Sequence, residues 1–169
     1  QVYGDSLTDR IVFEFGYTVS GIGDFDNVKF EGQYSPGNSP AATEVKNASY
    51  GSMASMLIEL GGLEPGSEHD QVTFTGTLAE LDGTLDVELI NSFVPEVGDV
   101  FTIFVYALDG SAAPTGTFAN TVLPELSDSW MEWDTTALYT DGTISVVPEP
   151  TTLAILALGG VVLARRRRS

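Results

Sequence analysis

The chain has 169 residues, of which 43% are hydrophobic, so it is long enough for one domain with a core of ordinary size. It contains no cysteine, which excludes disulfide bonds, thiolate zinc sites and cysteine nucleophiles together. The formal net charge is −17, and a chain this acidic repels phosphate backbones, which argues against nucleic acid as a partner.

The charge is unevenly distributed along the chain. Residues 1–146 carry 23 acidic residues against three basic ones, a net charge of −20, whereas the tail from Val147 carries four arginines against Glu149, a net charge of +3. A solvated acidic surface accounts for most of this charge and suits an extracellular or cation-rich setting. Gln1 begins without the basic and apolar regions of an export signal, so we expect that such a signal was removed or that more chain precedes it.

The body is predicted to consist of short strands. Apolar and polar residues alternate from Ile11 to Val19, which predicts one strand with a single apolar face. Residues 53–60 favour a strand over a helical turn, and residues 101–106, apolar on both faces, predict a strand buried on both sides. The alternation predicts further strands at Val72 and Phe74, at Leu85, Val87 and Leu89, and at Ile144 and Val146. Turn-forming residues separate these segments, and a recurring Gly-Thr-apolar motif suits a β-solenoid and a β-sandwich alike.

The first candidate for catalysis is the segment VYGDSLTD at residues 2–9, which resembles the nucleophile block of GDSL hydrolases. The resemblance implies an ester-attacking Ser6, which needs a histidine base that this family takes from an Asp-x-x-His sequence. The one histidine, His69, has Gly66 in place of that aspartate. We therefore expect Ser6 to lie in a turn and the chain to be no enzyme.

Two other segments carry candidate metal ligands. His69 lies between Glu68 and Asp70, which is too few ligands for a zinc or iron site, and we expect a surface turn there. The run DFDNVK at residues 24–29 begins like a calcium loop but has Lys29 where an EF-hand needs glycine. We expect no cofactor. The one alternative left open is a Ca²⁺ ion bound weakly by oxygen atoms of the turns.

Trp130 and Trp133, together with Tyr139, are the candidate sugar-stacking residues. The same side chains also suit the core or its edge, and this is the interpretation we favour. No pair of carboxylates stands out for glycoside hydrolysis among the 23 acidic residues of the body.

The tail departs from the body in composition. Pro148 and Pro150 are expected to end the sheet ladder and to form a stiff, extended joint. Residues 151–164 carry no charge over 14 positions, which is shorter than a full membrane helix of about 20 residues but extendable by snorkelling arginines. Four arginines then remain on the cytoplasmic side. The pattern predicts a body outside, a short span and a basic stop inside.

Pro-Glu-Pro, a short hydrophobic span and a basic cluster, in this order, resemble the PEP-CTERM sorting signal of Gram-negative bacteria. The resemblance implies that exosortase, a membrane protease-transpeptidase, recognises Pro148, Glu149 and Pro150 and processes the tail. It implies cytoplasmic retention by Arg165, Arg166, Arg167 and Arg168. It also implies a transient inner-membrane anchor formed by Leu153, Ala154, Ile155, Leu156, Ala157, Leu158, Val161, Val162 and Leu163. An ordinary anchor that is never processed is the alternative.

A looser resemblance covers about residues 21–146. The segments SPGNSP, LIELGGLEPGSEHD, LDGTLDV and GDVFTIF are similar to the C-terminal region of autotransporter-passenger-like surface proteins, although Ala41 replaces a usual glycine. This resemblance implies a parallel β-helix or its capping end, and no enzymatic activity.

We therefore predict an all-β fold, with a parallel β-helix or solenoid-like body, or alternatively a β-sandwich, followed by a short C-terminal transmembrane helix. Residues 1–146 form the extracellular β-rich domain, and residues 147–169 form the sorting signal. The predicted function is that of a secreted structural or adhesive protein of the bacterial envelope or exopolysaccharide matrix. The alternatives are a GDSL-like esterase or other polysaccharide-acting hydrolase, and a carbohydrate-binding module. The expected partners are exosortase, the inner membrane and exopolysaccharide. We expect the protein to be exported as a membrane-anchored precursor and then to reach the cell surface or extracellular matrix.

Overall fold

The computed structural model describes residues 10–37, 40–110 and 113–150, and this part of the chain has an all-β fold. Its strands are β1 (Ile11–Phe13), β2 (Thr18–Gly21), β3 (Phe25–Phe30), β4 (Gln33–Pro36), β5 (Ala42–Tyr50), β6 (Ser55–Leu60), β7 (Gln71–Leu81), β8 (Thr84–Leu89), β9 (Val100–Thr102), β10 (Phe104–Leu108), β11 (Thr115–Gly116), β12 (Asn120–Val122), β13 (Met131–Asp134) and β14 (Thr143–Pro148).

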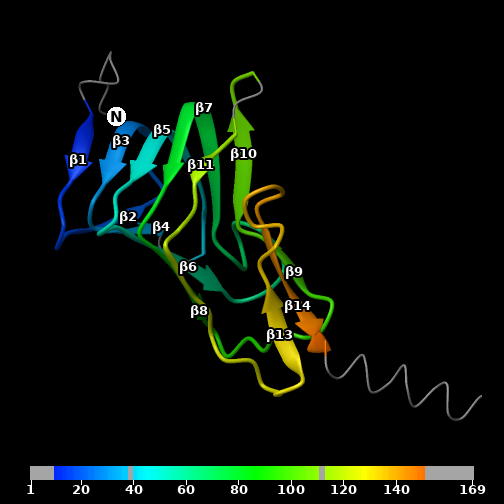
Figure 1. The fold of residues 1–169 in the computed structure, drawn as a ribbon. Coiled ribbons are helices and arrows are strands. Elements are labelled where there is room, and N and C mark those ends of the chain that lie inside the picture. Colours follow the sequence, from blue (N-terminus) through cyan, green and yellow to red (C-terminus); the bar gives the residue numbers. More distant parts are fainter. Residues whose placement is uncertain (1–9, 38–39, 111–112, 151–169) are drawn as a thin grey trace, which may run out of the picture.

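The chain passes alternately between two parallel sheets (Figure 1). Sheet A has the order β1-β3-β5-β7-β10, with the short β11 beside β7, and sheet B has the order β12-β8-β6-β4-β2. Neighbouring strands within each sheet are parallel, as in the pairs β3–β5 and β6–β8. Each strand from β1 to β6 therefore pairs with the strand two places further along the chain, while the strand between them belongs to the other sheet.

The third sheet, sheet C, lies at the end of the molecule away from β1 and has the order β13-β14-β9 (Figure 1). Both of its pairings are antiparallel. We expected a single strand at residues 101–106, and this is wrong, because the chain leaves one sheet for another at Ile103. β9 belongs to sheet C and β10 to sheet A. The apolar residues on both faces of this segment therefore belong to two different strands, one in each sheet.

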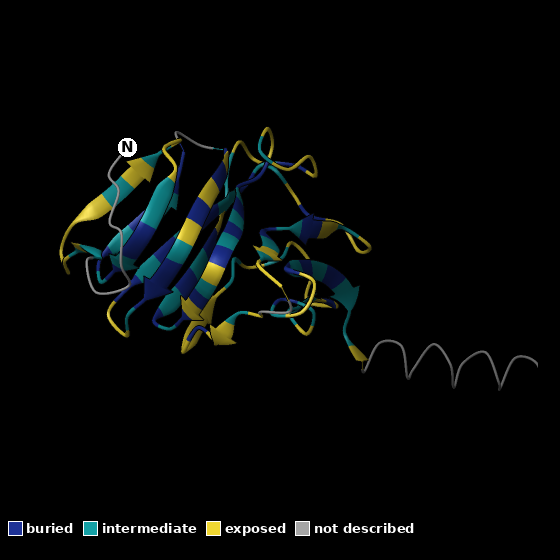
Figure 2. Cartoon of the chain, turned by 90° about the horizontal axis from the view of Figure 1, so that it is seen from above, coloured by how far each residue is buried: buried dark blue, intermediate teal, exposed yellow. Residues whose placement is uncertain are grey.

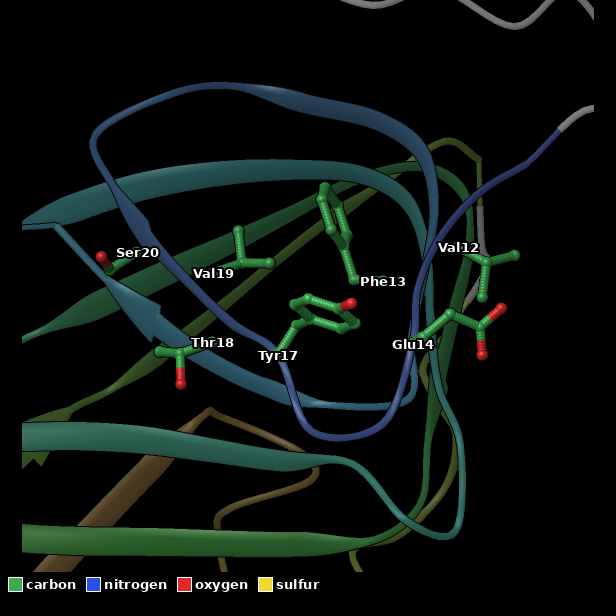
Figure 3. A pocket seen from close by; sticks show the side chains of 7 residues that line it. All are labelled: Val12, Phe13, Glu14, Tyr17, Thr18, Val19 and Ser20. Carbon is green, nitrogen blue, oxygen red and sulfur yellow. The ribbon is translucent and has the colours of Figure 1, made fainter.

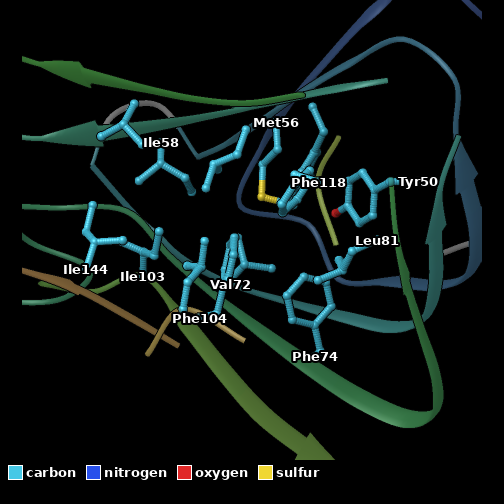
Figure 4. Close-up of a cluster of buried hydrophobic side chains, with 14 of the residues drawn as sticks. Tyr50, Met56, Ile58, Val72, Phe74, Leu81, Ile103, Phe104, Phe118 and Ile144 are labelled. Atoms are coloured by element: carbon cyan, nitrogen blue, oxygen red, sulfur yellow. The ribbon is translucent and has the colours of Figure 1, made fainter. Parts of the chain in front are cut away.

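A continuous row of aromatic rings fills the space between sheets A and B. Ring centroids lie 4.6 Å apart for Phe30 and Tyr34, 4.9 Å for Phe30 and Tyr50, and 5.5 Å for Phe74 and Phe104. Aliphatic and aromatic side chains from both sheets meet around this row (Figure 4). Buried aromatic residues contribute more apolar area than any others, so this row supplies much of the stability of the body.

The alternation of buried and exposed residues along the strands is visible in Figure 2. The predictions for Val72 and Phe74, for Leu85 and Val87, and for Ile144 and Val146 are confirmed, since each pair is buried within its strand. β6 confirms the strand expected at residues 53–60.

The strand expected from Ile11 to Val19 is wrong in extent. A turn separates β1 from β2, closed by the Tyr17 amide donating to the Glu14 carbonyl at 3.3 Å and passing through Gly16 at φ +88°. β1 and β2 belong to different sheets, so the alternation is interrupted and the turn carries its aromatic residues outward. Phe15 and Tyr17 are 65% and 68% exposed, whereas Phe13 packs against the core.

The predicted domain boundary after residue 146 falls inside β14, which continues to Pro148. Among residues 10–37, 40–110 and 113–150, no helix is long and apolar enough to cross a membrane. The predicted anchor at Leu153–Leu163 and the cluster Arg165–Arg168 lie outside the described residues.

Candidate functional site

The strand that leads into the predicted sorting signal is the central strand of sheet C. β14 pairs with β13 on one side and with β9 on the other. Ile144 and Val146 point into the core and are each 1% exposed. The Val146 amide donates to the Asp99 carbonyl at 3.0 Å, and the Val146 carbonyl accepts from the Gly98 amide at 2.9 Å. The start of the tail is therefore fixed to the body from both sides.

The first two residues of Pro-Glu-Pro are also held by sheet C. Pro148 lies opposite Met131, and the Glu149 amide donates to the Trp130 carbonyl at 2.8 Å. Hydrogen-bonded positions alternate along antiparallel strands, so at Pro148 the nitrogen does not face β13 and its missing N–H group is not needed there. We expected the prolines to end the ladder, and the pairing instead continues through Pro148. Pro148 and Glu149 are half-buried, and Pro150 is exposed.

Two hollows flank the segment that precedes β13. One, of about 400 Å³, is lined by Trp130, which is 44% exposed, together with Val94, Pro95, Glu96, Val97, Ser127, Asp128 and Met131. The other, of about 540 Å³, shares Ser127, Asp128 and Met131 and extends to Trp133 and Glu149. Both hollows therefore border the strand pair that holds the predicted sorting signal.

The three predicted sugar-stacking aromatics do not form one face. The Trp133 indole N–H donates to the Pro124 carbonyl at 2.9 Å, and its ring lies 5.9 Å from that of Phe101. The Tyr139 hydroxyl accepts from the Phe118 amide at 3.1 Å. Trp133 and Tyr139 thus pack against the core, as we favoured, and Trp130 is the one of the three that is exposed at the surface.

A turn lies at residues 66–68 as expected, but His69 at its end is buried, so the surface position expected for it is wrong. The side chain is 1% exposed, its Nδ1 lies 3.1 Å from the Gly62 carbonyl, and its ring meets that of Phe101 edge-on at 5.7 Å. Desolvation lowers the pKa of His69, and backbone hydrogen bonds offset this in part. A histidine enclosed in this way is not positioned to serve a nucleophile at the surface.

The sequence singles out Asp70 only as a neighbour of His69, yet in the structure its carboxylate joins two separate segments of the body. Its carboxylate is fully buried and accepts the Ala41 amide at 2.8 Å and the Glu59 amide at 2.9 Å. Burial raises the pKa of Asp70 to about 6, against the lowering effect of these two hydrogen bonds. The sequence signal for this role is weak, because it consists only of an aspartate between a Pro-Gly turn and an alternating strand.

The remaining candidates do not converge on a reaction centre. Ser6 lies outside the described residues. In the run DFDNVK, Asp26 pairs with Lys46 at 3.1 Å, and Lys29 pairs with Glu31. The described part of the chain holds no group of three or more histidine or carboxylate side chains arranged for a metal ion.

A further hollow of about 490 Å³ lies at the opposite end of the body, where β1 turns into β2. Figure 3 shows Phe13, Tyr17 and Val19 along it, with Val12 and Glu14 on the adjoining stretch. Its lining combines apolar side chains with hydroxyl groups and one carboxylate, and it contains no pair of groups suited to acid–base chemistry.

Comparison with known proteins identifies the tail. The model of the PEP-CTERM protein-sorting motif matches residues 146–168. The chain therefore carries a PEP-CTERM sorting motif. Such motifs are recognised by exosortase, and they mark exported proteins that are sorted at the membrane towards the cell surface.

The body has no counterpart in these comparisons. No curated protein matches the chain, and no solved structure matches it. The resemblance to autotransporter-passenger-like surface proteins thus receives no support from them. The PEP-CTERM motif begins inside β14, so the identified segment and the folded body share residues 146–148.

Proposed function

We propose that this chain is a structural or adhesive protein of the cell surface or extracellular matrix, released to that place when exosortase processes its tail. The observation that carries the proposal is the PEP-CTERM match at residues 146–168, directly continuous with a folded acidic body. In the proposal Pro148, Glu149 and Pro150 are the recognition residues. Residues 153–163 are the transient anchor in the inner membrane, and the four terminal arginines retain the precursor.

We further infer that the body is a short parallel β-helix with sheet C at one end. The chain alternates between sheets A and B while every pairing within them is parallel, which is the winding of a solenoid. The stacking of Phe30 on Tyr50 and of Phe74 on Tyr106 supports the same inference, because the two residues of each stack are opposed in neighbouring parallel strands. A β-sandwich of the immunoglobulin kind pairs its strands antiparallel instead.

The proposal assigns no catalysis to the body. It is supported by the enclosed position of His69 and by the hydrogen bonds that occupy the Asp70 carboxylate. The competing GDSL-like esterase is tested by Ser6→Ala against a panel of esters. Hydrolysis that is present in the wild type and lost in this variant would overturn the non-enzymatic proposal.

A carbohydrate-binding module is the second candidate, and one observation favours it. The exposed indole of Trp130 lines a hollow of about 400 Å³ with Glu96, Ser127 and Asp128 around it, so a flat apolar surface stands beside polar groups. Retention on exopolysaccharide should then fall in Trp130→Ala and stay unchanged in Phe15→Ala, which removes an exposed aromatic ring at the other end. Equal retention of both variants and the wild type would eliminate this candidate.

The sorting proposal is tested by the intact mass of the protein recovered from the cell surface. We expect a C-terminus at or shortly after Pro150 in cells with exosortase, and a C-terminus at Ser169 in the membrane fraction of cells without it. Glu149→Ala should likewise accumulate at full mass. An uncut chain at the surface of cells that contain exosortase would contradict the proposal.

A further inference from the structure

The sorting motif is partly folded into the body that it serves. Val147 lies opposite Glu132, Pro148 lies opposite Met131, and the Glu149 amide is hydrogen-bonded to the Trp130 carbonyl. Met131 is buried in the core, so this end of β13 is itself fixed. Only Pro150 of the Pro-Glu-Pro sequence is exposed.

An enzyme that binds a peptide in extended form pairs with its backbone amides and carbonyls and takes up alternate side chains in pockets, so these groups have to be accessible. At Glu149 the amide is already bound to Trp130, and at Pro148 one side of the chain is covered by Met131. Separation of residues 147–149 from β13 would free them without unfolding the body. Ile144 and Val146 would remain in the core, and Val146 would keep its two hydrogen bonds to the segment before β9.

We infer that the start of β13 is a positioning element for exosortase. Trp130 and Met131 hold Pro148 and Glu149 against sheet C, and the enzyme takes up the motif only when this end of β14 separates from β13. Residues 143–146 stay paired throughout, so the processed body keeps its central strand. The inference rests on the proposed sorting function and adds that the strength of one strand pairing sets the processing rate.

A disulfide between Glu132→Cys and Val147→Cys tests this directly. The two residues are directly opposed in antiparallel strands, where Cα atoms lie about 4.5–5.5 Å apart, within the reach of a disulfide. Glu132 is exposed and Val147 half-buried, so neither belongs to the core, and the wild-type chain has no cysteine to compete. The substitutions leave Pro148, Glu149 and Pro150 intact.

The matched control is Val100→Cys with Ser145→Cys, which are opposed in β9 and β14 and join the strand on its other side. Full-length proteins are incubated with membranes from cells that make exosortase, and the cut fraction is followed by intact mass. We expect the oxidised 132–147 pair to be cut at least about tenfold more slowly than the wild type, which corresponds to ~1.4 kcal/mol. Reduction should restore the rate, and the oxidised 100–145 pair should be cut at the wild-type rate.

The melting temperature shows whether slower processing comes from the locked strand pair or from a damaged fold. The 132–147 disulfide should raise or preserve the melting temperature while it slows processing. Met131→Ala gives a second readout without altering the motif, and loosened packing at this end should speed cutting about threefold to tenfold. Wild-type rates for both the oxidised 132–147 pair and Met131→Ala would overturn the inference alone. Failure of the wild type to be cut, or unimpaired cutting of Glu149→Ala, would overturn the sorting proposal beneath it.

Discussion

Sheets A and B differ from sheet C in how their strands are held. In sheets A and B every pairing is parallel, and a row of contacting aromatic rings lies in the core between the two sheets. Sheet C has three antiparallel strands, and its central strand is also the beginning of the sorting motif. The comparison teaches that the aromatic row between sheets A and B contains no residue of the sorting motif, whereas Pro148 and Glu149 of the motif depend on β13 and Trp130 for their local conformation.

The largest effect should come from removing β14 from sheet C. A chain that ends at Gly142 loses Ile144 and Val146 from the core, and burial of such side chains is worth about 1.5–3 kcal/mol each. We therefore expect its free energy of unfolding to be lower by about 3–6 kcal/mol. A chain that ends at Pro150 keeps the whole strand and should unfold like the full-length protein. Urea denaturation of both chains measures the difference. Equal stability of the two chains would mean that sheet C adds nothing to the body.

The second test breaks the aromatic row between sheets A and B. Phe30 is fully buried against Tyr34 and Tyr50, and Phe30→Ala should lower the free energy of unfolding by about 3–5 kcal/mol. Phe15→Ala removes the same ring from an exposed turn and should change it by less than about 0.5 kcal/mol. A loss for Phe30→Ala no larger than that for Phe15→Ala would show that the row is not the source of stability.

The raised pKa of Asp70 predicts that the stability of the folded body depends on pH. The folded protein raises the pKa of Asp70 from 3.8 to about 6, so it binds this proton more tightly than the unfolded chain does. The stability contribution is therefore fully present below about pH 4 and is lost as the pH rises to about 6, by at most about 3 kcal/mol. His69 acts in the opposite sense, since its lowered pKa removes stability as the pH falls.

Urea denaturation of the wild type and of Asp70→Asn, each at pH 4 and at pH 7, isolates the contribution of Asp70. The effect of His69 is present in both proteins and therefore cancels in the comparison. We expect Asp70→Asn to lose less stability than the wild type between these two pH values. Asp86→Asn, a change on the outer side of β8, should follow the wild-type curve. Parallel curves for wild type and Asp70→Asn would reject the assignment.

The smallest expected effect is the difference in stability between a variant of Trp133, which lies in β13, and a variant of Trp130, which directly precedes this strand. Trp133→Ala removes an indole that packs on Phe101 and donates a hydrogen bond to the Pro124 carbonyl, and should cost about 2–3 kcal/mol. Trp130→Ala removes a half-exposed side chain and should cost about 1 kcal/mol or less. Thermal melts of the two variants give the order, and a reversed order would exchange the structural and surface roles of the two residues.

Much of the strand pattern was predictable because alternation reports directly on burial. Val72, Phe74, Leu85 and Val87 behave as their spacing indicates. The predictions at Ile11–Val19 and at residues 101–106 missed strand breaks, because alternation does not reveal where a chain leaves one sheet for another. His69 was misplaced for a related reason, since a polar turn sequence does not show that β9 brings Phe101 against it.

The sorting tail is determined by local sequence, because recognition of Pro-Glu-Pro, an apolar span and terminal arginines depends on order and spacing along the chain. The all-β class follows likewise from short alternating segments separated by turn residues. Only the tertiary structure decided that Pro148 and Glu149 are paired with β13, that Asp70 binds two distant amides, and that Trp130 is exposed while Trp133 is not. Each of these features joins residues far apart in the chain, and such contacts arise from the packing of sheets rather than from any local pattern.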